Sequence, residues 1–484
     1  MKKFICFLFL TGCMVGPNYQ TPENTVTDEW SAPSDATLCA PLTEWWTVFN
    51  DSLLNQYIEA AAENNKNVLV AEANILQARA SRQVTASDLY PYIGADANAG
   101  EFRFSKNGLI FGPAAVTGKS PHAQSLFTAL FDANWELDLF GKTRRSIEAA
   151  DAIVESTVEE KNNVLISVMA ELARNYIEIR SYQKQAQLTE ANIVLLEQQA
   201  IIIQKQLEFG YVSLLNYEMI KANLATARAA LPDIKAGIYR GIYALSVLTG
   251  TVPETLLLEL LVPQALPKPP ETIAVGLRSD LLRRRPDVRM SERQLASATA
   301  NIGVSVASFF PSIVLGGIGG LQSLHLDKLF TSDSSIWGVG GNASLPVFEG
   351  GKLVGNLRVN QAATQVAYQT YQQTILQALE ETESALVAYT QERATALEYS
   401  VAVQRYRILV ELAAQRYEKG LTNRIDFLTS EQQLIAAEQN LLQSDTLALV
   451  DLIALYKALG GGWEFSQIKL GCEDAGSVWK TGAN

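Results

Sequence analysis

Two segments of the chain alternate apolar and polar side chains with the period of a β-strand. In residues 126–139 (LFTALFDANWELDL) every odd position is Phe, Ala, Trp or Leu, and the even positions include Thr, Asp, Asn and Glu. The second segment places Gly338, Asn342 and Ser344 opposite a face formed by Trp337, Val339, Ala343, Leu345 and Val347. A period of two predicts strands with two different faces. A strand of about 9–11 residues is long enough to cross a membrane.

Glycine-rich segments beside these two are the expected partner strands. They span residues 89–104 and 311–320, and the intervening residues 105–122 and 321–334 have the composition of surface loops. The pattern therefore predicts two hairpins with four strands in all. The alternative is a pair of soluble hairpins, each with one face packed on a core.

Long stretches without proline predict long helices. Residues 142–231 contain no proline and only one glycine, Gly210, and no proline follows Pro346. Inside a helix, proline costs about 3 kcal/mol and glycine about 1 kcal/mol. Steps of three and four, which define one helix face, separate the apolar residues Leu165, Val168, Met169, Leu172, Tyr176 and Ile179, and later Ala448, Leu452, Leu455 and Leu459. Helices of roughly 100 Å must bury such a stripe against neighbouring helices. A plain coiled-coil rod is the alternative.

These elements occur twice in the same order. Gly210 corresponds to Gly420, and LSVLTG ending at Gly250 corresponds to LYKALG ending at Gly460, both at an offset of 210 residues. Upstream, LDLFGK at 137–142 parallels LPVFEGGK at 345–352. ASDLYPYIGADANAG, which begins at residue 86, likewise parallels ASFFPSIVLGGIGG, which begins at residue 307. A shared order with a shared offset predicts an internal two-fold repeat.

The first residues have the pattern of a bacterial export signal. Lys2 and Lys3 precede an apolar stretch that ends at Gly12, directly before Cys13. This stretch is shorter than the about 20 apolar residues of a spanning helix, so residues 1–12 are predicted to be a signal peptide. LTGC at 10–13 resembles a bacterial lipobox, which implies a covalent lipid such as palmitate on Cys13. The alternative is an ordinary signal peptide that is cleaved elsewhere, with Cys13 incidental.

Four strands are too few to close a membrane barrel, because the smallest such barrels have about eight. Open sheet edges in lipid would leave backbone N–H and C=O groups unpaired, at a cost of several kcal/mol each. If the strands cross a membrane, several copies of the chain must share one barrel, and the helices continue it as a tube. These arguments predict an oligomer without giving the number of copies.

Composition narrows the possible functions further. The net charge of −12 argues against a nucleic-acid partner, because phosphate binding needs a basic face, and it favours a lumen that prefers cations. His122 and His325 stand far apart, so no metal site is expected. No nucleophile motif or phosphate loop indicates an enzyme or a cofactor. Cys39 and Cys472 either pair in an oxidising compartment or remain two separate thiols.

Two blocks closely resemble the TolC family of outer-membrane efflux channels, namely residues 281–313 (LLRRRPDVRMSERQLASATANIGVSVASFFPSI) and 346–362 (PVFEGGKLVGNLRVNQA). CMVGPNYQTP at 13–22 and YKALGGGW at 456–463 resemble its lipid-anchored branch, the OprM/NodT-type outer-membrane lipoproteins. The resemblance implies a mostly α homotrimer whose β-barrel, with four strands per chain, continues as a long periplasmic α-helical barrel. It implies a passive exit duct in the outer membrane that works with a periplasmic adaptor (membrane fusion) protein and an inner-membrane transporter, commonly of the RND class. The alternative is a lipid-anchored coiled-coil structural or adhesin-like surface protein, which explains the helices but not the strands.

The resemblance divides the chain into eight segments. After the signal peptide (1–12) come the lipidated N-terminus with the first helices (13–85), the first strand pair (86–140), the first long helix with its tip and return helix (141–250), an equatorial linker with helices (251–306), the second strand pair (307–350), the second long helix with its tip and return helix (351–460) and an equatorial C-terminal tail (461–484). A belt around the tunnel would draw on residues 13–65, 232–285 and 461–484. Trp45 and Trp46 are expected to pack within this belt rather than to anchor the protein in a membrane.

The resemblance also assigns roles to the turns between the long helices. It implies periplasmic tips that contact adaptor hairpins and close the tunnel, formed by Gly210, Ser213, Asn216, Gly420 and Asn423. Each glycine is equally explained as a helix end that needs a positive φ.

Related channels often carry an Asp and an Arg one turn beyond the second tip, where they form a charged constriction. The aligned positions here are Thr429 and Gln432, so the sequence departs from that arrangement. Arg424 and Asp426, with Glu431 nearby, are the candidates to replace it, and a ring of Asp426 or its neighbours is the expected narrowest point. RRRPD at 283–287 is interpreted as a helix start rather than a basic binding site.

Overall fold

The structure is a computed structural model, and it describes residues 14–23, 27, 30–31, 43–103, 123–270, 273, 275–276 and 278–464. Predictions on several positions lie outside these described residues: the signal peptide 1–12, Cys13, Cys39, the loop 105–122 with His122, and the tail from residue 465 with Cys472. The chain divides into two compact units. Unit 1 comprises Met1–Pro22, Ile75–Ser156 and Ser291–Tyr371, and unit 2 comprises Glu23–Asn74, Thr157–Met290 and Gln372–Asn484.

The order of elements repeats, and the equivalent helices have equal lengths. The first repeat consists of α2 (Lys66–Ser87), β1 (Tyr92–Phe102), β2 (Gln124–Leu137), α4 (Lys142–Glu208) and α5 (Leu214–Leu248). The second repeat consists of α8 (Pro286–Ala307), β3 (Ser312–Ser323), β4 (Ser335–Ser344), α9 (Lys352–Glu418) and α10 (Arg424–Ala458). α2 and α8 have 22 residues each, α4 and α9 have 67, and α5 and α10 have 35. The predicted internal repeat and mostly helical fold with four strands are confirmed.

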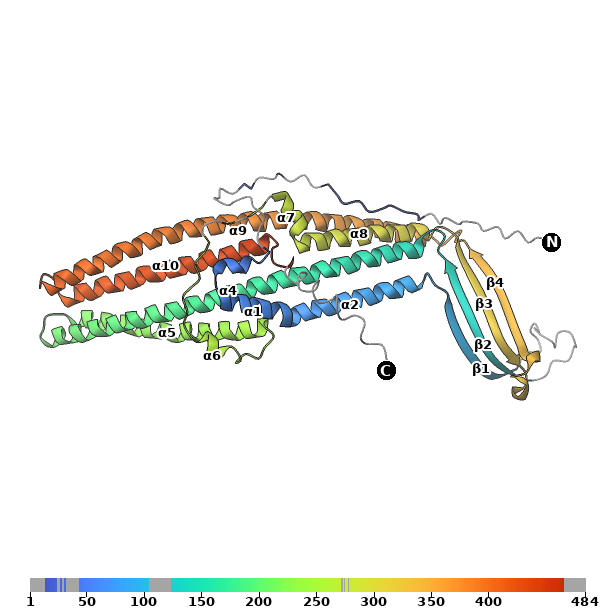
Figure 1. Cartoon of the computed structure of the whole chain (residues 1–484), viewed down its shortest axis with the longest axis horizontal. Helices are drawn as coiled ribbons and strands as arrows, with labels where there is room; N and C mark the ends of the chain where they lie inside the picture. Colours follow the sequence, from blue (N-terminus) through green and yellow to red (C-terminus); the bar gives the residue numbers. More distant parts are fainter. Residues whose placement is uncertain are drawn as a thin grey trace. The chain divides into compact units, whose positions relative to one another are not determined.

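The four strands of unit 1 form one antiparallel sheet in the order β1-β2-β3-β4 (Figure 1). The register aligns Phe131 with Ala95 and with Gly319, which in turn pairs with Trp337. The face defined by this row is apolar and includes Ile93, Ala97, Phe127, Trp135, Leu315 and Val339. Phe131, Trp337 and Val339 are 66%, 80% and 81% exposed in the single chain. The other face carries acids and amides among aliphatic residues, with Asp96, Asn98, Asp132, Asn134, Glu136, Gln322 and Asn342.

Both alternating strands end earlier than the sequence pattern predicts. β2 ends at Leu137 because the carboxylate of Asp138 accepts hydrogen bonds from the N–H groups of Thr143 (3.2 Å) and Arg144 (2.9 Å) and so begins α4. β4 ends at Ser344, which leaves the predicted strand residues Leu345 and Val347 beyond it. Pro346 has no N–H to donate to a ladder, which accounts for this end.

The core of unit 2 surrounds the middle of the long helices. Helix η1 (Trp45–Phe49) and helix α1 (Ser52–Asn64) contribute Trp45, Trp46, Leu54 and Ile58, which are all at most 1% exposed. Trp45 stacks on Tyr456 of α10 with ring centroids 5.6 Å apart, so it belongs to the core. Both predicted helix stripes are buried: Leu165, Val168, Met169, Leu172, Tyr176 and Ile179 of α4, and Ala448, Leu452, Leu455 and Leu459 at the end of α10.

The remaining helices of unit 2 are short. They are α6 (Leu257–Leu260) and α7 (Arg278–Arg284). Unit 1 also has two short helices, η2 (Leu326–Lys328) and η3 (Ser332–Ser334), between β3 and β4. Helix α5 continues through Pro232 without a break. The belt segment that the sequence predicts to begin at residue 232 therefore begins inside this helix. No helix in the described part of the chain combines the length and the apolar character needed to cross a membrane.

Candidate functional site at the helix-hairpin turns

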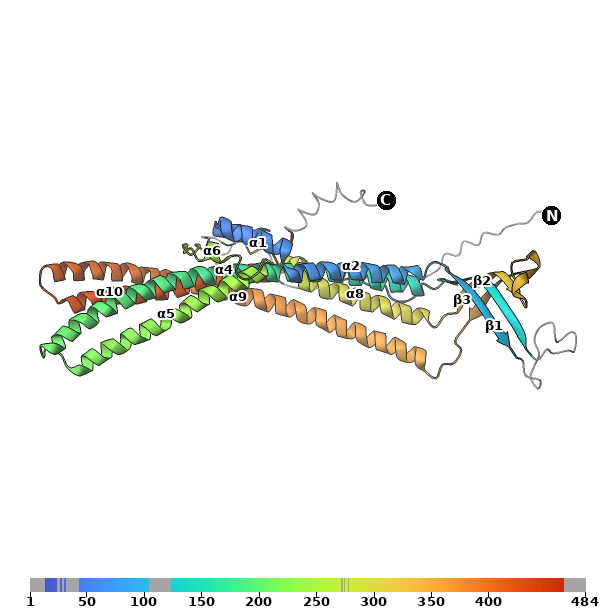
Figure 2. The ribbon, with the colours of Figure 1, turned by 90° about the horizontal axis from the view of Figure 1, so that it is seen from below.

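Both long hairpins of unit 2 reverse direction in the same kind of turn (Figure 2). Gly210 follows α4 with φ of +73°, and Gly420 follows α9 with φ of +70°. In the first turn the N–H of Tyr211 donates to the carbonyl of Gln206 at 2.8 Å, and the equivalent bond closes the second turn. This six-to-one bond with a left-handed glycine is a standard helix C-terminal cap. A Cβ at either glycine would meet no neighbour, so the backbone conformation alone calls for glycine.

Polar residues follow each turn and begin the return helices. Ser213 precedes α5, and its hydroxyl lies 3.4 Å from the side-chain oxygen of Asn216. Asn423 precedes α10, and its side-chain oxygen accepts a hydrogen bond from the N–H of Asp426 at 2.8 Å. The carboxylate of Asp426 in turn accepts from the hydroxyl of Thr422 at 2.7 Å. Asp426 is therefore held within its own turn.

Two of the aperture candidates connect the second hairpin to the first. Arg424 donates from Nη2 to the side-chain oxygen of Gln198 on α4 at 3.0 Å. About two turns further along α10, the side-chain oxygen of Gln432 accepts a hydrogen bond from Nε2 of Gln199 at 3.0 Å. Thr429 donates instead to a carbonyl of its own helix at 2.8 Å. The structure thus joins Arg424 and Gln432 to α4 and leaves Asp426 and Thr429 bonded locally.

Acidic groups along α10 are shifted by their surroundings. Burial raises the pKa of Glu431, and the positive charge of Arg424 opposes that rise. Burial also raises the pKa of Asp445. Burial and the negative charge of Glu392 together raise the pKa of Asp451. At these three positions the surroundings therefore favour the protonated, neutral carboxyl group.

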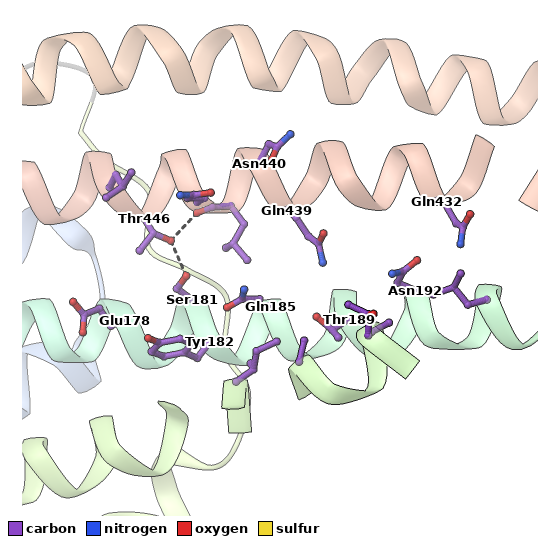
Figure 3. A pocket seen from close by; sticks show the side chains of 18 of the residues that line it. Glu178, Ser181, Tyr182, Gln185, Thr189, Asn192, Gln432, Gln439, Asn440 and Thr446 are labelled. Atoms are coloured by element: carbon purple, nitrogen blue, oxygen red, sulfur yellow. Dashed lines mark hydrogen bonds between the residues drawn. The ribbon is translucent and has the colours of Figure 1, made fainter. Parts of the chain in front are cut away.

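A neutral polar groove continues from the Gln199–Gln432 contact along α4, α5 and α10. Its volume is about 890 Å³. Figure 3 shows Gln432, Gln439 and Thr446 of α10 on one wall, across from the α4 residues Asn192, Gln185 and Ser181. Thr446 donates to the hydroxyl of Ser181 at 2.8 Å. Among the described lining residues Glu178 carries the one formal charge.

Sequence reasoning did not identify this groove, although the chain carries a signal for it. Gln432, Gln439 and Thr446 are spaced by seven residues, and so are Glu178, Gln185 and Asn192. A spacing of seven keeps side chains on one side of paired helices. Polar side chains at that spacing also fit a solvated face, and the sequence alone does not distinguish the two.

The basic motif RRRPD is satisfied within the chain. Arg285 is buried and donates to the carbonyl of Ala458 (3.0 Å) and to the carboxylate of Asp287 (2.7 Å). Trp463 donates from its indole N–H to the carbonyl of Arg284 at 3.2 Å. The RRRPD and ALGGGW segments therefore pack on one another, as a structural joint rather than an open basic site. In the described residues no group of three or more His, Cys, Asp or Glu side chains is arranged to hold a metal.

Comparison with known proteins gives consistent matches over most of the chain. The family model of the outer membrane efflux protein matches residues 57–251 and 277–461, one match per repeat. The probable efflux pump outer membrane protein TtgC of Pseudomonas putida KT2440 is 30% identical over 467 residues, which cover 94% of this chain and 93% of the relative. The cation efflux system protein CusC of Escherichia coli O157:H7 is 28% identical over 96% of this chain and 99% of its own length. The solved outer-membrane channel OprN superposes with a TM-score of 0.82 at 29% identity, covering 93% of this chain and all of OprN.

Two repeated long helical hairpins, each joined to two antiparallel strands of a sheet with an exposed apolar face, define a channel protein of the TolC-like class. The chain belongs to the outer membrane efflux protein family. It is a non-enzymatic outer-membrane channel of an efflux pump system and extends into the periplasm.

Proposed function

We propose that three copies of this chain assemble into one exit duct of a tripartite efflux system, anchored by a lipid on Cys13. The observation that carries the assembly is the four-stranded sheet with its exposed apolar face. Strands β1 and β4 are its edges, and neither edge has a strand partner within the described chain. In lipid, those edges would leave a row of backbone groups unpaired. Sheets from three chains, edge to edge, would give a barrel of about twelve strands, within the known range.

The hairpin turns are the proposed contact for a periplasmic adaptor protein. Large apolar side chains are exposed around the first turn, where Phe209, Tyr211 and Leu215 are 73%, 81% and 76% exposed. Leu421 at the second turn is also exposed. Such side chains at the end of a helical hairpin suit a partner that brings helices of its own. Ser213, Asn216 and Asn423 supply polar groups at the rim, and an RND-type transporter would complete the pump.

The contacts between α10 and α4 are the proposed closure of the duct. The Arg424–Gln198 and Gln199–Gln432 hydrogen bonds hold the second hairpin against the first within one chain. Opening that moves the second hairpin inward or outward would have to break both. Hydrogen bonds of this kind contribute about 0.5–1.5 kcal/mol each, with more for the charged one. Losing both would shift a closed-to-open equilibrium by roughly tenfold to a hundredfold.

Planar-bilayer recordings of the purified chain test both the channel and its closure. We expect the Arg424→Ala/Gln432→Ala double variant to conduct more than the parent chain, while Asp426→Ala has a smaller effect. Arg407→Ala is the matched control, because Arg407 forms its ion pair with Glu438 between α9 and α10, within the second hairpin. Equal conductance of the double variant and the control would refute the proposed closure.

The assembly and the anchor have separate measurements. Native mass spectrometry in detergent is expected to give the mass of three chains, and a monomer would contradict the shared barrel. The mass of the N-terminal peptide is expected to show acyl chains on Cys13, and an unmodified thiol there would remove the lipid anchor from the proposal.

A further inference from the structure

Residues 14–21, here called the strap, follow Cys13 in sequence and lie along both repeats in unit 1. The N–H of Val15 donates to the carbonyl of Phe140, between the end of β2 and the start of α4, at 3.2 Å. Gly16 has φ of +92°, and a Cβ there would lie 2.5 Å from the Cα of Gly303 on α8. The strap therefore touches the first repeat at Phe140 and the second at Gly303, in contacts that leave no room for a side chain at residue 16.

Arg145, in the first turn of α4, holds the strap by its backbone. Its side chain is 1% exposed. The guanidinium donates to the carbonyls of Val15 (3.1 Å) and Gly16 (3.2 Å) and to the side-chain oxygen of Asn18 (2.7 Å). A fourth bond, at 2.7 Å, joins it to the carboxylate of Glu148. Glu148 therefore neutralises the buried charge of Arg145, and the other three hydrogen bonds of the guanidinium go to residues 15–18 of the strap.

A second contact follows on α8. The hydroxyls of Tyr19 and Thr21 both donate to the carboxylate of Glu292 at 3.0 Å. Arg293 lies over the ring of Tyr19, with its guanidinium carbon 5.7 Å from the ring centre, and pairs with Glu155 of α4 at 3.1 Å. The strap is thus fixed at both of its ends, by charged groups of α4 at the first point and by charged groups of α8 at the second.

We propose that Arg145 is a positioning residue for the lipid anchor: it locks the strap across the two repeats, so that Met14, the residue directly after the one that bears the lipid, is held beside the junction of β2 and α4. The presence of the lipid depends on the proposed function above. The locking of the strap is independent of it, because the contacts of residues 14–21 alone support the lock.

The physical case is one of local stability. A terminal segment without contacts opens freely, whereas a segment tied by several buried, charge-assisted bonds opens with a substantial fraction of the global stability. Without Arg145, the strap would lose three of its hydrogen bonds, and the acyl chains would hold the protein at a membrane without fixing its position. With Arg145, the anchor also fixes where along the protein the membrane surface lies.

Chymotrypsin digestion of the full-length, detergent-purified protein measures this directly. Tyr19 is a cleavage site inside the strap, and cutting there produces a chain that begins at Gln20. We expect Arg145→Gln to speed the appearance of this product by about tenfold or more, because cleavage follows the local opening of the strap. Cleavage at other sites and the circular dichroism spectrum should be unchanged. Arg145→Lys, which keeps the charge but has a smaller donor set, should restore protection in part.

Arg82→Gln is the matched control, since Arg82 pairs with Asp151 in the same unit on an exposed surface and does not touch the strap. Equal rates of the Gln20 product in the parent, Arg82→Gln and Arg145→Gln proteins would overturn the proposal. If Arg145→Gln does not fold, Asn18→Ala decides, because it removes a single acceptor on the strap. Faster cleavage of Asn18→Ala supports the lock, and an unchanged rate overturns it.

The same digest separates this inference from the lipid proposal. The released peptide runs from Cys13 to Tyr19 when the signal peptide is removed before Cys13, and its mass reports any acyl chains. Protection that depends on Arg145 together with an unacylated peptide would retain the locked strap and refute the lipid anchor. An acylated peptide together with cleavage that is independent of Arg145 would retain the lipid anchor and refute the locked strap.

Discussion

Replacing Arg285 by methionine tests whether the joint between the RRRPD and ALGGGW segments stabilises unit 2. Methionine keeps most of the volume and removes the charge. The guanidinium bonds to the carbonyl of Ala458 at 3.0 Å and to the carboxylates of Asp287 and Glu381 at 2.7 Å each. The carbonyl of Ala458 keeps a second donor, the hydroxyl of Thr382, at 3.3 Å. The cost therefore arises mainly at the two carboxylates.

The magnitude follows from the exposure of these carboxylates. Breaking a fully buried ion pair costs about 3–5 kcal/mol. Here the side chain of Glu381 is 54% exposed and water can solvate it, whereas that of Asp287 is 23% exposed and stays partly desolvated. We therefore expect a loss of about 2–3 kcal/mol, between an exposed and a buried pair. For a chain of this size this corresponds to a fall in the unfolding midpoint of roughly 2–5 °C.

Thermal unfolding in detergent, followed by circular dichroism at 222 nm, measures this loss. Arg407→Met is the control, because Arg407 is 63% exposed and its pair with Glu438 should contribute less than about 1 kcal/mol. If the two variants unfold at the same temperature, the joint does not stabilise unit 2 and the reasoning from burial fails.

Two further predictions concern the same unit. Trp45→Ala should lose about 3–5 kcal/mol in denaturant unfolding, because Trp45 is fully buried against Tyr456, and a loss below 1 kcal/mol would contradict its place in the core. Burial and Glu392 raise the pKa of Asp451, so the folded chain holds this proton more tightly, and its stability falls as the pH rises through that raised pKa. Asp451→Asn should therefore be the more stable protein at pH 7, with a gain that vanishes below about pH 4; a gain independent of pH would contradict this origin.

The helices were predictable from the sequence because their signal is local. The stretch without proline or glycine from residue 142 to the turn at Gly210 predicts the first long helix, and α4 spans Lys142–Glu208. Proline and glycine report on the backbone of their own turn, so their absence marks a helix whatever it packs against. The glycine turns were found for the same reason, since a positive φ is a property of one residue.

The side-chain arrangement was less predictable because it depends on distant partners. Arg145 and Arg285 look like surface charges in the sequence, yet both are buried, and the backbone carbonyls of Val15 and Ala458 that accept from them lie 130 and 173 residues away. The strand ends at Leu137 and Ser344 were missed because a helix cap and a proline, rather than periodicity, decide them. The roles of the turn residues in adaptor contact and closure stay predictions.

The two hairpins can be compared position by position, which shows the contacts that occur in both and those that occur in one. The first hairpin joins α4 to α5 by Glu197 and Arg228 at 2.6 Å, and the second joins α9 to α10 by Arg407 and Glu438 at 3.0 Å. At the offset of 210 these are equivalent positions with exchanged charges. The attraction depends on the product of the two charges, so the exchange preserves it, whereas changing one partner alone would set like charges together. The contacts of Arg424 with α4 have no such counterpart, because residue 214 is leucine. The hairpins therefore share a packing geometry, whereas the contact of Arg424 with Gln198, on which the proposed closure rests, occurs once and starts from the second hairpin.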